Sequence, residues 1–219
     1  MDKRKIYYLT IDTETANSLE DALVYDIGGA IHDKNGNVYE TFSFVVAEIF
    51  FDMADIMNSA YYSEKLPQYY ADIKNGTRKV ARWLTIKNHI ANLCSKYNVK
   101  AIIAYNMRFD YKSTATTQRY LTKSKNRYFF PKSVELWDSL KMVDDTIAKQ
   151  KLYVDFCKTN GLLQKNGKPN RKAETVYRYL TSNPNYIEEH TGLADVLIET
   201  QIFAKCMRQH KKMRKLAFS

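Results

Sequence analysis

The sequence predicts an α/β fold in which a mixed five-stranded sheet, with three antiparallel strands followed by parallel strands, is flanked by helices. Two observations carry this prediction. Residues 5–12, 24–33 and 38–46 are rich in β-forming side chains, and no helix-length segment separates the last two. Helical and strand patterns then alternate along the chain, which is typical of helices packed on parallel strands.

The first three strands are expected to form a meander. Asn35 and Gly36 lie between the second and third runs, and this dipeptide favours a tight hairpin turn. The first run, KIYYLTID, ends in polar and acidic residues. In sheets of this type, functional sites favour the carboxyl ends of the strands.

Residues 80–98 place apolar side chains at roughly helical spacing: Val80, Trp83, Leu84, Ile90, Leu93 and Cys94. The run KAIIAY that follows predicts a buried strand. We then expect a helix over residues 107–121, a short strand over 134–137, a loop over 164–172, and helices in most of the remainder. Residues 47–74 are predicted to be helical with an interruption at Pro67.

Composition indicates one domain spanning residues 1–219, with a basic C-terminal tail over about 208–219. Lysine and arginine number 34 against 24 acidic residues, and the net charge of +10 favours a polyanionic partner, with nucleic acid the first candidate. The three cysteines form no CxxC pair, which argues against a disulfide framework and a cysteine-rich zinc site. Without a signal peptide or a membrane-spanning apolar run, we expect a cytoplasmic protein and no membrane partner.

The first candidate motif is IDTET, at the end of the first strand. Asp12 and Glu14 are two residues apart, so their carboxylates point to the same face of a strand. Neighbouring like charges resist joint ionisation, and a hard divalent cation bound through oxygen atoms removes that conflict. The alternative is a solvated strand end, which a lone D-x-E pair would favour.

Two further acidic motifs follow later in the chain. Asn106 is expected to cap the helix after KAIIAY, which places Asp110 on its first turns at the same end of the sheet. In HTGLAD, Thr191 is the expected N-cap of the last helix, with Asp195 on its first turns and His190 in the entering loop. The alternatives are an ordinary acidic helix start and a structural or surface histidine.

Taken in order, IDTET, Asn106-x3-Asp110 and His190-x4-Asp195 resemble the three motifs of the DEDDh-type, DnaQ-like 3′-to-5′ exonucleases. This group of the ribonuclease H-like superfamily includes the proofreading epsilon subunit of bacterial replicative polymerase, ribonuclease T and oligoribonuclease. The resemblance implies a ribonuclease H-like fold. It also implies a metal-dependent exonuclease that releases nucleoside monophosphates from single-stranded 3′ ends, with DNA favoured over RNA.

The resemblance also implies residue roles. Two Mg²⁺ or Mn²⁺ ions would be held by four carboxylates, those of Asp12, Glu14, Asp110 and Asp195. His190 would accept a proton from the attacking water, a role that suits an imidazole on a glycine-containing loop. Two cations at such a site activate water, stabilise the reacting phosphorus and neutralise the leaving oxygen.

Substrate contacts are implied at four positions, Thr13, Thr15, Asn106 and Phe109. Backbone groups around the two threonines would meet the terminal nucleotide, whereas Asn106 and Phe109 would mainly hold up the site. Gly28 resembles a glycine of the family's second strand, where it allows close packing. The chain departs from the family at Ala16-Asn17, where Thr-Gly often follows IDTET, so the local nucleotide pocket is expected to differ.

Positive charge suited to phosphates occurs in HKKMRK near the C-terminus and in KNGKPNRK at residues 165–172, and paired tyrosines at 61–62 and 69–70 offer rings for base stacking. The implied partners are single-stranded DNA or RNA 3′ ends, with a DNA polymerase or a second copy of the chain as further candidates. EEHTGLADVLIE resembles stand-alone exonucleases of bacteriophages, which would place the protein in a host cytoplasm.

Two other functions remain open at this point. A ribonuclease H-like endonuclease shares the metal-binding carboxylates but has no need of the His-x4-Asp element. A noncatalytic nucleic-acid-binding or polymerase-associated module would keep the fold, but it has no reason to gather negative charge against a phosphate backbone. A DxDxT phosphatase is excluded because Glu14 stands where its second aspartate is required.

Overall fold

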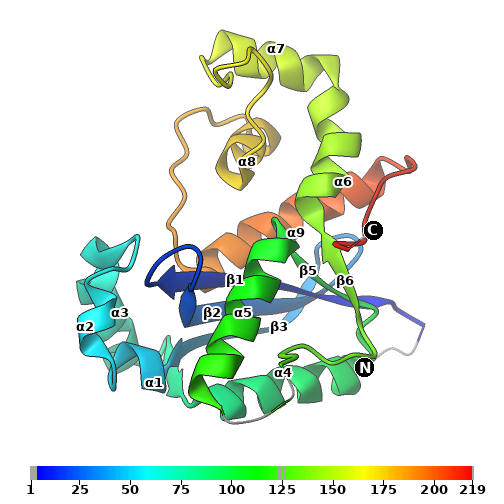
Figure 1. Ribbon diagram of the computed structural model, residues 1–219. Coiled ribbons are helices and arrows are strands. Elements are labelled where there is room, and N and C mark those ends of the chain that lie inside the picture. The colour runs from blue at the N-terminus through cyan, green and yellow to red at the C-terminus, as the bar shows by residue number, and fades with distance from the viewer. Residues whose placement is uncertain (1–3, 123–124, 126, 219) are drawn as a thin grey trace.

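The computed structural model describes residues 4–122, 125 and 127–218. In these residues a six-stranded sheet has the order β4-β3-β2-β1-β5-β6 (Figure 1). The strands are β1 (Tyr7–Ala16), β2 (Leu23–Asp33), β3 (Val38–Val46), β4 (Lys79–Ala81), β5 (Ala101–Ala104) and β6 (Glu135–Asp138). β1, β2 and β3 are antiparallel, whereas β5 runs parallel to β1 and β6 runs parallel to β5. The predicted order of antiparallel and then parallel strands is therefore confirmed.

The predicted number of five strands is wrong, because β4 adds a parallel strand at the edge beside β3. Two of its three residues, Val80 and Ala81, fall in the segment expected to be helical from Val80, and that helix begins at Trp83 instead. A strand this short shows no periodicity in the sequence. Two of the apolar side chains used to predict this helix are exposed: Val80, before its start, by 41%, and Leu84, within it, by 58%.

The helices are α1 (Ala47–Phe50), α2 (Ala54–Met57), α3 (Leu66–Asn75), α4 (Trp83–Tyr97), α5 (Met107–Leu121), α6 (Ser139–Asp145), α7 (Lys151–Thr159), α8 (Ala173–Thr181) and α9 (Gly192–Arg208), with short 3-10 turns η1 (Ser63–Lys65) and η2 (Ile147–Lys149). The region 47–74 is thus broken into short pieces, and Pro67 starts α3 rather than interrupting a helix. Residues 164–172 form a loop, as predicted. None of the described helices is long and apolar enough to cross a membrane.

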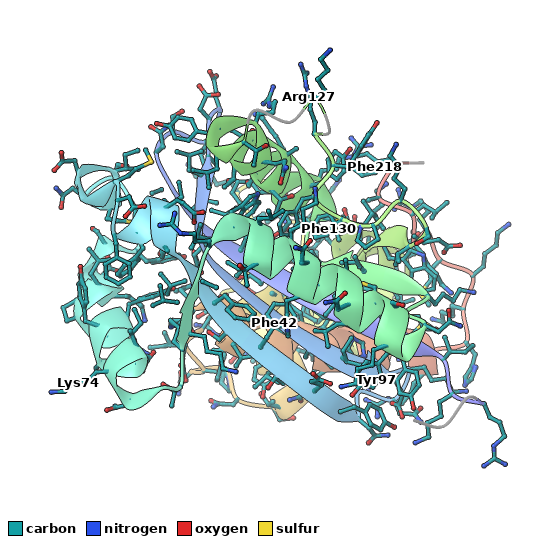
Figure 2. The ribbon with its side chains drawn as sticks, turned by 90° about the horizontal axis from the view of Figure 1, so that it is seen from below. Phe42, Lys74, Tyr97, Arg127, Phe130 and Phe218 are labelled. Atoms are coloured by element: carbon teal, nitrogen blue, oxygen red, sulfur yellow. The ribbon has the colours of Figure 1, made fainter. Side chains whose placement is uncertain are left out.

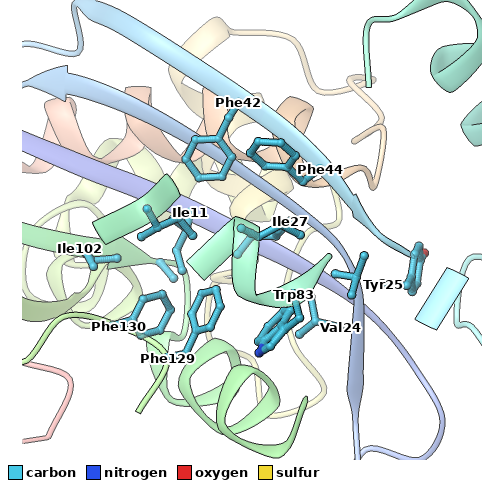
Figure 3. Packing of buried hydrophobic residues seen from close by; sticks show 14 of the residues in the cluster. Ile11, Val24, Tyr25, Ile27, Phe42, Phe44, Trp83, Ile102, Phe129 and Phe130 are labelled. Carbon is cyan, nitrogen blue, oxygen red and sulfur yellow. The ribbon is translucent and has the colours of Figure 1, made fainter. Parts of the chain in front are cut away.

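One face of the sheet is covered by α4, with α5 beside it (Figure 1). Alternation along β1 sends Leu9 and Ile11 to this face, where Trp83 of α4 stacks on Phe129 at 4.4 Å between ring centroids. Figure 3 shows these aromatic rings gathered opposite Ile11 and Ile27. In Figure 2, α4 lies across the strands, with Phe42 of β3 beside it and Tyr97 at its C-terminal end. This face is the larger apolar core.

The opposite face packs against α9, with α6, α7 and α8 beyond it. The alternate residues of β1 point here, and the Tyr8 ring lies 4.9 Å from the Phe203 ring of α9. Thr10 follows on the same face and shares a 2.8 Å hydrogen bond with buried His32. Because the side-chain period of a strand is two, Asp12 and Glu14 continue this series and also face α9.

The turn between β2 and β3 confirms the predicted hairpin. Gly36 has a φ of +86°, a conformation that glycine adopts without strain. The Asp33 carboxylate accepts hydrogen bonds from the backbone N–H groups of Asn35, at 2.9 Å, and Asn37, at 3.1 Å. The side chain and the glycine together fix the register of the meander.

The C-terminal segment lies along the outer edge of β6. The backbone N–H of Asp138 donates to the Lys215 carbonyl at 2.7 Å, and that of Ala217 donates to the Leu136 carbonyl at 2.9 Å. Arg214 pairs with Asp145 at 2.8 Å. This part of the predicted basic tail therefore covers a sheet edge, and a carboxylate neutralises one of its charges.

α9 approaches β2 most closely at two glycines. Gly28 pairs with Asp12 across the β1–β2 ladder. A Cβ atom at Gly28 would lie 2.3 Å from the backbone carbon of Gly192, the first residue of α9. This confirms that Gly28 allows close packing, and it sets the distance between α9 and the carboxylates of β1.

We predict that Gly28→Ala will lower the free energy of unfolding by about 1–3 kcal/mol, because the new methyl group must push the α9 backbone away. Urea unfolding followed by tryptophan fluorescence measures this loss. Gly29→Ala is the comparison variant, because its methyl group would meet the buried ring of Phe42 on the other face, so it reports the cost of displacing a side chain instead of the α9 backbone. Equal stability of Gly28→Ala and the wild type would show that this contact does not constrain the fold.

Candidate functional site

Three of the predicted carboxylates meet where the carboxyl end of β1 faces the start of α9. Asp12 and Glu14 lie on the α9 side of β1, and Asp195 lies on the first turn of α9. A carboxylate oxygen from each of these residues lies within 4.8 Å of the others. Segments 180 residues apart in the chain thus bring their acidic groups to one point.

Asp110 approaches the same end of the sheet from the other face. It lies on the first turn of α5 and is almost fully buried. Thr13, between the two acidic residues of β1, points to this face, and its Oγ1 donates to Asp110 Oδ1 at 2.8 Å. Thr13, whose backbone is predicted to meet the terminal nucleotide, therefore uses its side chain to orient Asp110.

The other predicted residues of this region lie around the start of α5. Asn106 occupies the N-cap position with a φ of +71°, but in the described structure its side chain makes no capping hydrogen bond, so that expectation is wrong. Its backbone N–H instead donates to buried Asp138, whose carboxylate caps α6. Phe109 is half-buried beside it, and Thr15 is half-buried near the end of β1.

The start of α9 is held by a group that sequence analysis missed. Thr191 is the N-cap residue, as predicted, but among the described contacts the cap has no side-chain hydrogen bond from it. Asp26 of β2 replaces it and accepts from the Gly192 N–H at 3.0 Å. Asp26 is fully buried and also accepts from Arg78 at 2.6 Å and from the Tyr69 hydroxyl at 2.7 Å.

The Arg78–Asp26 pair is buried on both sides, and the guanidinium also lies 4.1 Å from the centroid of the Tyr69 ring. Removing one member of such a pair leaves an uncompensated buried charge, which is strongly destabilising. The Arg78 guanidinium forms ion pairs with two carboxylates, those of Asp26 and Asp72. It is therefore not shared with the carboxylates of β1 and α9.

Burial is the main cause of raised pKa values throughout the carboxylate cluster, and repulsion from neighbouring carboxylates adds to it. The pKa of Asp12 lies well above its usual range. Burial raises the pKa of Glu14 to about 9, that of Asp195 to about 8 and that of Asp110 to about 7. Without an added cation, the cluster therefore holds protons at neutral pH.

Glu199 is a further buried carboxylate that sequence analysis missed. It lies one turn after Asp195 on the same side of α9, and Tyr105 donates its backbone N–H to Glu199 Oε2 at 3.2 Å. After burial, repulsion from Glu199 is the largest influence on the raised pKa of Asp12. The signal was available, because an acidic residue four positions after Asp195 shares its helix face.

His190 lies just before α9 with a φ of +52°. Its imidazole is stacked on the Tyr62 ring, with 4.3 Å between centroids and 9° between planes. Its Nδ1 lies 3.8 Å from Glu188 Oε2, and partial burial lowers the pKa of the imidazole. His190 also reaches the cluster through its backbone, which hydrogen-bonds Asp195 and opposes the rise of that carboxyl's pKa.

The donor set fits a hard divalent cation. Asp195 Oδ1 is buried and has no hydrogen-bond partner in the part of the chain that the structure describes. The oxygen lies in a group of three carboxylates whose charges repel one another, with Asp110 and Glu199 close behind. Carboxylate oxygens are the ligands that Mg²⁺ and Mn²⁺ prefer, and a bound cation would remove the repulsion.

The raised pKa values predict how the stability of the metal-free protein depends on pH. The folded cluster keeps protons that the unfolded chain loses near pH 4, so stability falls as pH rises from about 4 to about 9. In EDTA we expect the Tm to be lower at pH 8.5 than at pH 5.5, by about 2–4 °C for each kcal/mol lost. Addition of Mn²⁺ should raise the Tm by more at pH 8.5 than at pH 5.5.

Thermal unfolding at the two pH values, with EDTA and with Mn²⁺, measures this effect. Asp12→Asn should weaken both the pH dependence and the Mn²⁺ effect, because it removes one of the repelling charges. Asp155→Asn, an exposed site on α7, is the matched control and should behave as the wild type. A Tm that rises with pH in EDTA would contradict the assignment of protonated carboxylates.

No protein-family model matches the chain, and no curated protein matches it in sequence. Solved structures do match. The E. coli exonuclease I structure in complex with an oligonucleotide has a TM-score of 0.56 and 16% identity, covering 90% of this chain and 40% of the other. Cell-death related nuclease 4 (CRN-4) has a TM-score of 0.55 and 10% identity, covering 95% and 66%. Exonuclease I from Methylocaldum szegediense has a TM-score of 0.52 and 19% identity, covering 94% and 41%.

The chain thus spans about two fifths of the length of these exonuclease I proteins. At such identities the likeness establishes the fold, which extends over almost the whole of this chain. The fold that the three acidic motifs imply is confirmed at that level: the chain shares its fold with these solved nuclease structures.

Proposed function

We propose that the protein is a metal-dependent 3′-to-5′ exonuclease that releases nucleoside 5′-monophosphates from single-stranded nucleic acid. The observation that carries the proposal is the carboxylate cluster of half-buried Asp12 and Glu14 with buried Asp195, set in the fold of solved exonuclease structures. The oligonucleotide in the E. coli exonuclease I structure and the net charge of +10 support a nucleic-acid substrate.

Asp12, Glu14, Asp110 and Asp195 would hold two divalent cations, Mg²⁺ or Mn²⁺, which would lower the pKa of the attacking water and stabilise charge on the phosphate. Buried carboxylates on strand and helix ends keep this arrangement fixed before substrate binds. Thr13 helps by holding Asp110 in place through its hydroxyl. This preorganisation favours the charge that develops in the transition state.

His190 is proposed as the general base. Its lowered pKa keeps the imidazole neutral at pH 7, so one ring nitrogen is free to accept the proton of the attacking water. The water oxygen forms the new bond to phosphorus as the bond to the 3′ oxygen of the preceding nucleotide breaks. A cation at the carboxylates would neutralise that leaving oxygen until it takes a proton from solvent. Glu188, 3.8 Å from Nδ1, would stabilise the resulting imidazolium.

The compartment and the partners of the protein belong to the same proposal. Three buried free thiols, Cys94, Cys157 and Cys206, suit a reducing compartment such as the cytoplasm. A preference for DNA, a polymerase partner, a homodimer and a bacteriophage origin stay predictions from the sequence. They can be tested after the activity itself.

The direct test uses single-stranded DNA and RNA of about twenty nucleotides, labelled at the 5′ end, in Mg²⁺, Mn²⁺ or EDTA. We expect a ladder that shortens one nucleotide at a time, depends on the metal and is absent for Asp12→Ala. His190→Ala should lower kcat by about 10²–10⁴, the usual contribution of a general base, with little change in metal affinity.

Other outcomes would overturn parts of this proposal. Internal cuts would favour the ribonuclease H-like endonuclease, and tight binding without cleavage in any metal would favour a noncatalytic module. Comparable turnover of His190→Ala and the wild type would remove the general-base assignment alone. His89→Ala, at a histidine on α4 that lies against Phe42 and Phe44, is the matched control for losing an imidazole.

A further inference from the structure

A groove of ≈ 580 Å³ with a mixed apolar and polar lining opens beside the carboxylate cluster. Tyr62 and His190 line one wall, and Gln164, Asn170, Arg171 and Lys172, from the loop before α8, line the other. The groove thus combines aromatic rings, amides and cations. Single-stranded nucleic acid is recognised through these same groups, by base stacking and by attraction to the phosphates.

We propose that this groove binds the nucleotide on the 5′ side of the scissile phosphate, with Lys172 as the ligand of its phosphate. The inference rests on the proposed exonuclease function and adds a second substrate subsite to it. Lys172 would fix how the strand enters the site, whereas the carboxylates act on the bond that breaks. The subsite would therefore act on oligonucleotides and not on a single nucleotide ester.

Charge singles out Lys172 within the groove. Arg171 is neutralised by an ion pair with Asp144 at 2.6 Å. For Lys172, no carboxylate of the described residues lies within salt-bridge distance, and its side chain is exposed. Its positive charge nevertheless reaches the wall opposite, where it adds to the effect of burial in lowering the pKa of His190 and opposes the rise that burial causes in the pKa of Glu188. A phosphate in the groove would supply the missing counter-charge.

The loop that carries Lys172 is tied to the cluster. The Tyr105 hydroxyl donates to the backbone carbonyl of Arg171, while the backbone N–H of the same tyrosine donates to Glu199. The Asn170 side chain accepts from the Lys172 N–H at 3.0 Å, which fixes the turn into α8. Lys172 is therefore held at a set place relative to the carboxylates, as a subsite requires.

The opposite wall offers a surface for a base. The parallel rings of Tyr62 and His190 form one continuous stack, and stacking accepts any base because every base has a π face. Glu188 is the carboxylate in this wall. Its side chain is only 12% exposed, and burial raises its pKa to about 7, so its repulsion of a nearby phosphate is reduced.

Position in the fold indicates which nucleotide the groove takes. On the α5 side of β1, the side chains of Thr13 and Asp110 are buried against each other, so protein closes that side of the cluster. The groove lies on the other side, where α8 begins and His190 leads into α9. A strand whose scissile phosphate lies at the carboxylates would therefore place its preceding nucleotide in the groove.

The test compares two substrates in Mn²⁺: the p-nitrophenyl ester of thymidine 5′-monophosphate, which has no preceding nucleotide, and a single-stranded oligonucleotide of about eight. For Lys172→Gln we expect the ratio of the oligonucleotide KM to the ester KM to rise about tenfold, with kcat for the oligonucleotide changed less than about twofold. Lys172→Arg should restore the ratio. Lys151→Gln, an exposed site on α7, is the matched control and should match the wild type.

Direct binding gives a readout that does not depend on turnover. Fluorescence anisotropy of a labelled oligonucleotide with Ca²⁺ should give a slope of log affinity against log salt that is smaller by about 0.7 for Lys172→Gln, the effect of one lost phosphate contact. An unchanged KM ratio and an unchanged slope would overturn the subsite while leaving ester hydrolysis, and so the exonuclease function, intact. Failure of the wild type to hydrolyse either substrate would instead overturn the exonuclease function, and with it the subsite that rests on it.

Discussion

The contact between β2 and the start of α9 is the constraint on which the candidate site depends. Gly28 and Gly192 let the two backbones touch, and buried Asp26 binds the Gly192 N–H. These contacts fix where α9 begins, and therefore where Asp195 lies relative to the carboxylates of β1. Arg78 forms an ion pair with Asp26, which offsets the cost of burying the Asp26 charge. The geometry of the site is thus set by groups that have no proposed part in the reaction.

The second consequence of this packing is electrostatic. Bringing α9 close to β1 gathers several buried and half-buried carboxylates, and the charge of buried Arg78 is already paired with Asp26. The repulsion between these carboxylates lowers the stability of the metal-free fold, but the same arrangement favours binding of a divalent cation. Active sites commonly lower the stability of a fold in this way. The repulsion contributes to the raised pKa values of Glu14 and Asp195.

Much of the fold could be predicted because it follows from local patterns. Alternation along β1 placed Asp12 and Glu14 on one face, and the Asn35-Gly36 turn fixed the hairpin. The ordered acidic motifs implied which segments meet. The short edge strand β4 and the cap of α9 by Asp26 could not be predicted, because each depends on a partner distant in the sequence. Glu199 was missed although its spacing from Asp195 placed it on the same helix face.

The central claim is that the buried carboxylates form a divalent-cation site that holds protons until the cation binds. Calorimetric titration of Mn²⁺ at pH 7, repeated in buffers of different ionisation enthalpy, measures binding and proton release together. Because burial raises the pKa of Glu14 to about 9 and that of Asp195 to about 8, binding should release at least about one proton per protein molecule. Binding without proton release, or equal binding by Asp12→Ala, would contradict the account.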